Sequence, residues 1–190
     1  MATCAWCGRD FRPERMGRPP RYCNQVCRKR ASRARRNASI PAELTSRPRW
    51  IRHAHKRPIT PAGWPASVTD PQTWGPYETA AASTVGTGLG FVLGEGVGCL
   101  DFDHVIRDGV LDPEVAALIA SLPPTYVEVS PSGEGLHVWG MIPEAPGRVL
   151  TIGGVRVERY SRARYLTVTE VPWRSSVARL ADLSDTLQWT

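Results

Sequence analysis

The second half of the chain alternates apolar and polar residues over short runs, as β-strands with one buried face do. Residues 90–105 read as two apolar strands joined through Glu95-Gly96. Residues 125–140 read as a strand, a turn rich in serine and glycine, and a returning strand, and residues 154–169 read as a further hairpin. The pattern predicts a sheet built from short strands.

Three other segments carry helix signals. An Asp-Pro pair provides the cap and first turn of two expected helices, one over residues 70–82 and one over residues 113–122. Residues 175–189 have the spacing of one short amphipathic helix. Apolar residues recur on one face of the last two helices, so these faces are expected to be buried. These apolar residues are Val115, Leu118, Ile119 and Leu122 in the helix over residues 113–122, and Val177, Leu180, Leu183 and Leu187 in the helix over residues 175–189.

At 190 residues, 42% of them hydrophobic, the chain can form one domain with a packed core and a small appendage. We divide it into an appendage over residues 1–37, an aperiodic linker over 38–49 that contains serines and prolines, and a main domain over 50–190. No run approaches the roughly 20 apolar residues of a membrane span, and the N-terminus carries no apolar signal segment. The sequence predicts a soluble, cytoplasmic protein whose five cysteines are reduced thiols or metal ligands.

Positive charge is concentrated in the appendage. Residues 1–37 contain 11 Lys or Arg against 2 Asp or Glu, a net of +9, and residues 38–190 contain 13 against 16, a net of −3. Residues 28–36 read as an arginine-rich helix with little apolar face. Such a block favours contact with nucleic-acid phosphate, and a solvated disordered tail is the alternative. The expected DNA-binding residues are Arg28, Lys29, Arg30, Arg33, Arg35 and Arg36.

Four cysteines in the appendage have the spacing of a zinc site. Cys4 and Cys7 are followed, after a loop of fifteen residues, by Cys23 and Cys27. Two such pairs can place four thiolates tetrahedrally around Zn²⁺, and Gly8 suits the tight turn after the first pair. Because the segment has few apolar side chains, zinc would supply its folding energy. The stretch YCNQVCRKRASRARR resembles small bacterial zinc fingers.

The second strand of residues 90–105 carries two acids, Asp101 and Asp103, with Phe102 between them. Both carboxylates therefore point to one face of the strand, while Leu100 and Phe102 point into a core. Paired hard oxygen ligands can share one or two Mg²⁺ or Mn²⁺ ions and suit reactions on phosphates. Taken alone, an Asp-x-Asp pair is more often a solvated turn or a cap.

The turn within residues 125–140 gathers groups that bind anions. Ser130 and Ser132 supply hydroxyls, Gly133 and Gly135 supply backbone N–H groups, and His137 returns on the next strand. Together these groups can surround a phosphate. The alternative is an ordinary Ser/Gly hairpin with a histidine in the core.

A third carboxylate, Glu158, lies in the last predicted hairpin. Val155 and Val157 face one side of that strand, so Glu158 faces the other, with Arg164 and Tyr165 entering the next strand. Glu158 is therefore a candidate for the same metal site. A surface glutamate paired with an arginine is the alternative.

Taken in order, the Asp-x-Asp strand, the Ser-x-Ser-Gly-x-Gly-x-His hairpin and the later glutamate resemble the archaeo-eukaryotic primase superfamily. More closely, they resemble the bifunctional primase-polymerase domain of phage and plasmid replication proteins. The supporting stretches are DPQTW at 70–74, GLGFVLGEGVGCLDFDHV at 88–105, YVEVSPSGEGLHVWG at 126–140 and VERYSRARYLTVT at 157–169. The resemblance implies an α+β fold in which an RRM-like, mostly antiparallel sheet is flanked by helices.

The resemblance also implies metal-dependent, template-directed nucleotidyl transfer from NTP or dNTP. Asp101 and Asp103 would bind the catalytic Mg²⁺ or Mn²⁺, Glu158 would complete that site, and His137 would donate to phosphate. The implied nucleotide-binding residues are Ser130, Ser132, Gly133, Gly135, His137, Arg164 and Tyr165.

Three functions compete on this pattern. The first is a primase-polymerase that makes primers for phage or plasmid replication on single-stranded DNA, in the bacterial host cytoplasm, with a separate helicase. The second is a non-catalytic zinc-finger protein that binds DNA as a replication accessory. The third is a metal-dependent nuclease that uses the same acids and needs no triphosphate pocket.

Overall fold

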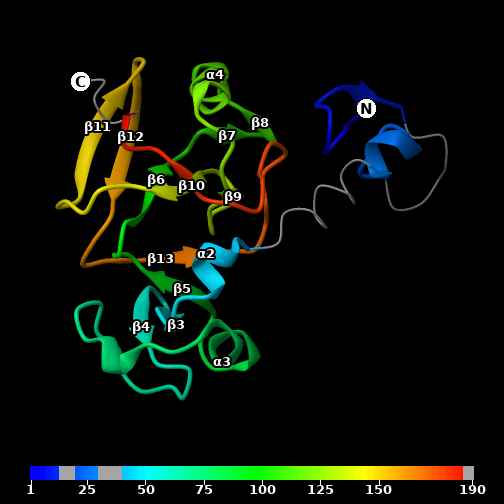
Figure 1. The fold of residues 1–190 in the computed structure, drawn as a ribbon. Helices are drawn as coiled ribbons and strands as arrows, with labels where there is room; N and C mark the ends of the chain where they lie inside the picture. Colours follow the sequence, from blue (N-terminus) through cyan, green and yellow to red (C-terminus); the bar gives the residue numbers. More distant parts are fainter. Residues whose placement is uncertain (13–19, 30–39, 186–190) are drawn as a thin grey trace.

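The structure is a computed structural model that describes residues 1–12, 20–29 and 40–185. Two β-sheets form the main body, and Figure 1 shows them as separate layers with helix α4 (Pro113–Ser121) beyond one and α3 (Tyr77–Ala82) beside the other. The strands are mostly antiparallel and the helices are few and short, so the predicted α+β class is confirmed. In the described residues, no helix is long and apolar enough to cross a membrane.

The first sheet has four antiparallel strands in the order β13-β5-β3-β4. Their bounds are β3 Trp50–Ala54, β4 Arg57–Ile59, β5 Gly88–Val92 and β13 Tyr165–Val168. The second sheet has the order β11-β12-β6-β10-β14, and β9 also pairs with β10. Its strands are β6 Val97–Phe102, β9 Val127–Val129, β10 Leu136–Met141, β11 Arg148–Ile152, β12 Val155–Tyr160 and β14 Ala181–Asp182.

Two apolar cores hold these layers together. The first lies between the second sheet and α4, and it contains Leu100 and Phe102 of β6 together with the apolar face of the helix. That helix begins at Asp112, whose carboxylate accepts from two backbone N–H groups, as the sequence predicts. The second core contains Trp50 of the first sheet and Trp139 of the second, so it joins the two sheets.

Two pairs of consecutive strands belong to different sheets. β5 and β6 follow each other in the chain but pair with different neighbours, and so do β12 and β13. The prediction of a hairpin over residues 154–169 is therefore wrong. β12 pairs with β11 and β6, while Leu166 and Val168 of β13 are buried in the core that joins the sheets. Burial of these two side chains outweighs the local turn signal.

Two predicted helices also differ from the structure. The segment 70–82 splits into a 3-10 turn (Pro71–Thr73) and α3, because Gly75 exchanges backbone hydrogen bonds with Trp50 of β3. In the described part of residues 175–189 the chain forms β14, which runs parallel to β10. Leu183 is still buried, but its N–H donates to Met141 at the edge of the sheet.

Part of the expected linker also packs with the main body. Residues Ala42–Thr45 form the short helix α2, and Leu44 is fully buried in the core that joins the sheets. The carbonyl of Leu44 accepts the indole N–H of Trp50 at 3.0 Å. A single apolar residue followed by a tryptophan gave too little periodicity to reveal this contact from the sequence.

The remaining elements are small. In the appendage, β1 (Ala2–Thr3) pairs with β2 (Asp10–Phe11), and residues 25–29 are helical. In the main body, β7 (Ile106–Arg107) and β8 (Val110–Leu111) form a two-stranded ribbon between β6 and α4.

Candidate active site

Three of the predicted site residues lie side by side in one row across the second sheet. Asp101 of β6 is opposite Glu158 of β12 on one side and His137 of β10 on the other. His137 is in turn opposite Glu128 of β9. Directly opposed residues project from the same face of a sheet. At Cys99 this face of β6 is buried in the core that joins the two sheets. Asp101 projects from the same face, because side chains alternate along β6, but it lies beyond that core.

Asp101 has an unusual environment for a carboxylate. Its Oδ1 atom is buried and accepts no hydrogen bond. Burial raises the pKa of Asp101 above its ordinary value, with His137 acting against this shift, and the nearby carboxylates of Asp103 and Glu158 raise the pKa further. A buried oxygen that has no donor and lies near further carboxylates suits a divalent cation. The residues present therefore fit the metal that the motif implies.

The other two acids are placed differently. Asp103 is exposed just past the end of β6. Glu158 is half-buried and accepts hydrogen bonds from the Tyr160 hydroxyl and from Arg156 at 3.1 Å, and the bond from Tyr160 lowers the pKa of Glu158 most. The glutamate–arginine pair that the sequence left open as an alternative is thus present. Among the described residues, only the four cysteines bring three or more ligand atoms within 4.8 Å of one another, so the three acids do not.

His137 is buried, and its two ring nitrogens face different carboxylates. Nε2 lies 3.6 Å from Asp101 Oδ1, and Nδ1 lies 3.4 Å from Glu128 Oε1. Glu128 is fully buried. Glu128 is not among the site residues predicted from the sequence. A glutamate between Val127 and Val129 in an apolar strand was nevertheless a usable signal, because a buried glutamate needs partners.

Most hydrogen-bonding groups of the Ser/Gly turn pair with one another. The Ser130 hydroxyl accepts from the Gly135 N–H at 3.1 Å and lies 3.1 Å from the Ser132 hydroxyl. The Gly133 N–H donates to the Ser130 carbonyl at 2.9 Å. The two predicted backbone donors are therefore used inside the tight turn instead of facing an anion. Gly135 is needed for packing, because a Cβ there would overlap the carbonyl oxygen of Phe102.

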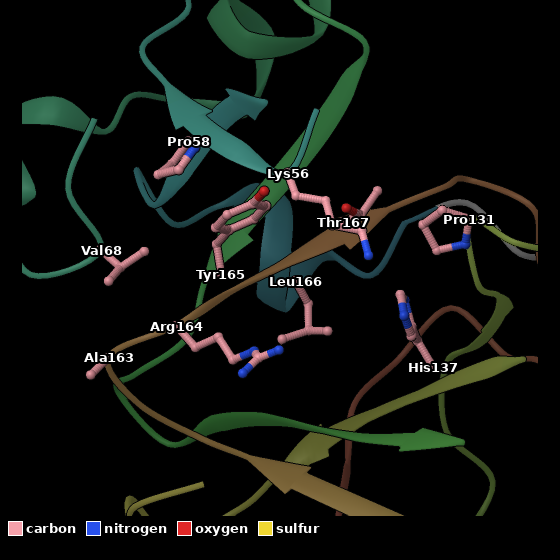
Figure 2. A pocket seen from close by; sticks show the side chains of 10 residues that line it. All are labelled: Lys56, Pro58, Val68, Pro131, His137, Ala163, Arg164, Tyr165, Leu166 and Thr167. Carbon is pink, nitrogen blue, oxygen red and sulfur yellow. The ribbon is translucent and has the colours of Figure 1, made fainter. Parts of the chain in front are cut away.

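A cleft of about 500 Å³ opens next to this row (Figure 2). Figure 2 shows His137 entering it from the second sheet, with Arg164 and Tyr165 on the opposite side, at the start of β13. Lys56, at the tip of the β3–β4 hairpin, also lines the cleft and was not predicted individually, although the basic run at 52–57 could have indicated it. The three predicted acids are not part of this lining. The cleft size suits a small ligand, and its cations suit a negatively charged one.

The Tyr165 ring, which lines the cleft, is stacked on a second ring from β3. The rings of His53 and Tyr165 stack with centroids 6.0 Å apart and planes inclined by 27°. They lie across glycines of β5: a Cβ at Gly88 would be 2.6 Å from His53 Nε2, and one at Gly90 would be 2.7 Å from Tyr165 Cδ2. Glycine at both positions therefore leaves room for the flat rings.

The four predicted zinc ligands come together. Their sulfur atoms all lie within 4.8 Å of one another, with Cys7 and Cys23 at 3.7 Å and Cys23 and Cys27 at 3.6 Å. Burial opposes ionisation of Cys4, but neighbouring backbone N–H groups lower its pKa to about 6. Burial and the neighbouring thiols raise the pKa of Cys23 to about 12. Because four close thiolates repel one another, a dication is what would hold them together, and the cluster fits zinc.

Only two of the predicted DNA-binding residues lie within the part of the chain that the structure describes. Arg28 and Lys29 are exposed at the end of helical residues 25–29, directly after Cys27. Arg30, Arg33, Arg35 and Arg36 lie outside the described residues.

Comparison with known proteins agrees with the motif reading for part of the chain. No protein-family model matches it. Over 116 residues it is 36% identical to a protein named DNA Primase-polymerase from Nitratiruptor phage NrS-1. The match covers 56% of this chain and 16% of the phage protein, so the chain spans a small part of its relative's length. Over more than half of its length, the chain is therefore similar in sequence to a phage DNA primase-polymerase.

Proposed function

We propose that this chain is the catalytic part of a DNA primase-polymerase and performs metal-dependent, template-directed nucleotidyl transfer to make primers for phage or plasmid replication. The observation that carries the proposal is the row in which Asp101, with its donor-free buried oxygen, lies between Glu158 and His137 beside a cationic cleft. The similarity of the chain to the phage protein supports a DNA template and nucleotide substrates.

In this proposal Asp101, Asp103 and Glu158 hold Mg²⁺ or Mn²⁺. A metal bound there would lower the pKa of the attacking 3′-OH and neutralise charge on the phosphates. Asp101 lies within strand β6, whereas Asp103 is exposed just past the end of that strand. Glu158 joins the site when its carboxylate turns from Arg156.

The protein's own cations bind the triphosphate in the cleft. Arg164 lies with its guanidinium carbon 4.0 Å from the centre of the Tyr160 ring, which holds its charge near the acids. His137 lines the opposite side of the cleft and donates to phosphate from Nε2 once that nitrogen carries a proton, and Lys56 adds charge from the β3–β4 hairpin. The hydroxyls of the Ser130–Ser132 turn border the same ligand, and Tyr165 lies against the nucleotide. Charge and positioning of this kind stabilise the transition state of phosphoryl transfer.

The appendage would bind the template. Zinc held by Cys4, Cys7, Cys23 and Cys27 would fix the start of the arginine-rich segment, which then contacts phosphates of single-stranded DNA. Strand separation is assigned to a separate helicase, and the protein would work in the cytoplasm of the bacterial host.

A primer-synthesis assay tests the proposal. Zinc-loaded protein is mixed with unprimed single-stranded DNA, labelled NTP or dNTP, and Mn²⁺ or Mg²⁺. Wild type should make labelled oligomers, and Asp101→Asn and Asp103→Asn should each lose at least about 100-fold in rate. Asp108→Asn is the matched control, because Asp108 is an exposed acid at the β7–β8 turn. Full activity in either site variant would exclude the mechanism.

A DNA-binding accessory protein is the second candidate. It is favoured by the separation of the three acids and by the Arg156–Glu158 pair. This reading expects DNA binding that survives the double variant Asp101→Asn/Asp103→Asn and disappears with Cys23→Ser, with no primer synthesis by wild type. Template degradation instead of synthesis would point to a nuclease.

A further inference from the structure

Glu128 is the most deeply buried acid of the second sheet, and the function proposed above gives it no role. The side chain is fully buried on β9, at the end of the row that contains His137 and Asp101. A buried carboxylate is tolerated only when hydrogen bonds satisfy it. The donors around Glu128 therefore indicate what it does.

The two oxygens of Glu128 have separate tasks. Oε2 accepts from the Tyr126 hydroxyl at 3.1 Å and from the backbone N–H groups of Thr169 and Glu170 at 3.0 and 3.1 Å. These bonds tie β9 to the chain just after β13 and are structural. Oε1 faces inward and accepts from the indole N–H of Trp139 at 3.2 Å. The second neighbour of Oε1 is the imidazole Nδ1 at 3.4 Å.

This arrangement decides which imidazole nitrogen carries hydrogen. An indole N–H and a backbone N–H can only donate, so a carboxylate surrounded by them is an acceptor and has no hydrogen to give. His137 Nδ1 must then donate to Glu128. The imidazole ring is also held edge-on to the Trp139 ring, with centroids 6.3 Å apart and planes at 83°. Because the Nδ1 edge is fixed, the Nε2 edge faces Asp101 at 3.6 Å.

We propose that Glu128 is a positioning residue that fixes the ring orientation and tautomer of His137, so that Nε2 always faces Asp101 beside the nucleotide cleft. The catalytic consequence depends on the proposed nucleotidyl transfer, whereas the tautomer itself does not. Glu128 does not line the cleft itself, and His137 is the cleft residue that it contacts, so any effect on the reaction passes through His137.

The variant Glu128→Gln makes a sharp prediction. Three donors meet at the Oε2 position, so the amide oxygen of glutamine must lie there. Its NH₂ group then takes the Oε1 position and donates to His137 Nδ1. A nitrogen that accepts cannot carry hydrogen, so the neutral ring should move its hydrogen from Nδ1 to Nε2.

Nitrogen NMR of protein labelled with ¹⁵N-histidine measures this directly, in mildly alkaline buffer and without nucleotide. The chain has four histidines, and loss of one signal set in His137→Asn assigns the residue. Wild type should show a protonated Nδ1 at His137, and Glu128→Gln should exchange the protonated and bare nitrogens. A wild-type ring protonated only at Nε2 would overturn the proposal even if the variant fails to fold. An unchanged ring in a folded Glu128→Gln variant would do the same.

Two matched variants separate positioning from structure. Tyr126→Phe removes a donor from the Oε2 side and should leave the His137 tautomer unchanged. Glu134→Gln changes the second histidine–glutamate pair found among the described residues, His104 and Glu134 at 3.1 Å, and should alter the His104 signals alone. If Tyr126→Phe exchanged the His137 nitrogens as Glu128→Gln does, the assignment of Oε1 to positioning would be wrong.

Kinetics supply the second readout. With an active wild type, Glu128→Gln should lose about 10- to 100-fold in kcat, as is common when the partner of a functional histidine is removed. Tyr126→Phe, with similar or greater loss of thermal stability, should keep most of the rate. Equal losses of rate in both variants would show a structural role only. Should wild type make no primers, the proposed function fails while the tautomer experiment still decides the role of Glu128.

Discussion

Replacing Asp101 by asparagine should make the protein more stable as well as inactive. Asp101 Oδ1 is buried without a donor, and the charge faces the carboxylates of Asp103 and Glu158. A buried polar group that lacks a partner costs about 1 to 3 kcal/mol. Asparagine keeps the shape and removes the charge, so we expect the free energy of unfolding to rise by about 1 to 2 kcal/mol. For a chain of this size that corresponds to an increase in Tm of about 2 to 8 °C.

The pH dependence of this gain has a defined sign. Because the pKa of Asp101 is raised in the native state above 3.8, the folded protein binds this proton more tightly than the unfolded chain does. The stabilising contribution of Asp101 is therefore complete below that value and is lost as the pH rises through the native pKa. The stability advantage of Asp101→Asn should be greatest at neutral pH and should vanish in acid.

Thermal unfolding of zinc-loaded protein, followed by circular dichroism with and without Mn²⁺, measures both effects. Mn²⁺ should stabilise wild type by about 2.7 kcal/mol at 100 times its Kd and should stabilise Asp101→Asn much less. The control Asp108→Asn should behave as wild type. The reasoning is refuted if Asp101→Asn is less stable than wild type at neutral pH without metal, or if Mn²⁺ stabilises both equally.

Three further predictions concern the turn, the glutamate and the zinc cluster. Gly135→Ala should lower the free energy of unfolding by about 3 kcal/mol in a denaturant titration, because the new Cβ would overlap backbone atoms. Gly133→Ala should lower it by about 1 kcal/mol, because only the positive φ opposes the change there. Equal losses would contradict the packing of the turn. Tyr160→Phe should raise the pKa of Glu158, measured by carbon NMR of the carboxyl group, because the hydroxyl bond that lowers it most is gone; an unchanged pKa would count against that bond. Cys23→Ser should abolish stoichiometric zinc in elemental analysis and weaken binding to single-stranded DNA, while leaving the thermal unfolding of the main body in place; retained zinc would argue against a four-cysteine site.

Features that depend on neighbours in the chain were predictable from the sequence. The Asp-Pro pair at 112–113 placed the start of α4, and the spacing of the four cysteines placed their cluster. The two-residue period placed Asp101 on the face opposite Leu100 and Phe102, and Glu158 on the face opposite Val155 and Val157. Each of these depends on geometry within a few residues, which a local pattern encodes.

The tertiary structure alone decided which strands pair. β5 and β6, like β12 and β13, separate into different sheets, and the end of the chain adds a strand to β10 where a helix was predicted. Only that pairing brings Glu158, Asp101, His137 and Glu128 into one row from four separate strands. Side-chain periodicity states which face a residue occupies, but it does not state the partner strand or the register, because these depend on burying apolar side chains far apart in sequence. The sequence by itself therefore determined the chemistry available to this protein, and the pairing of its strands decided which of those groups meet.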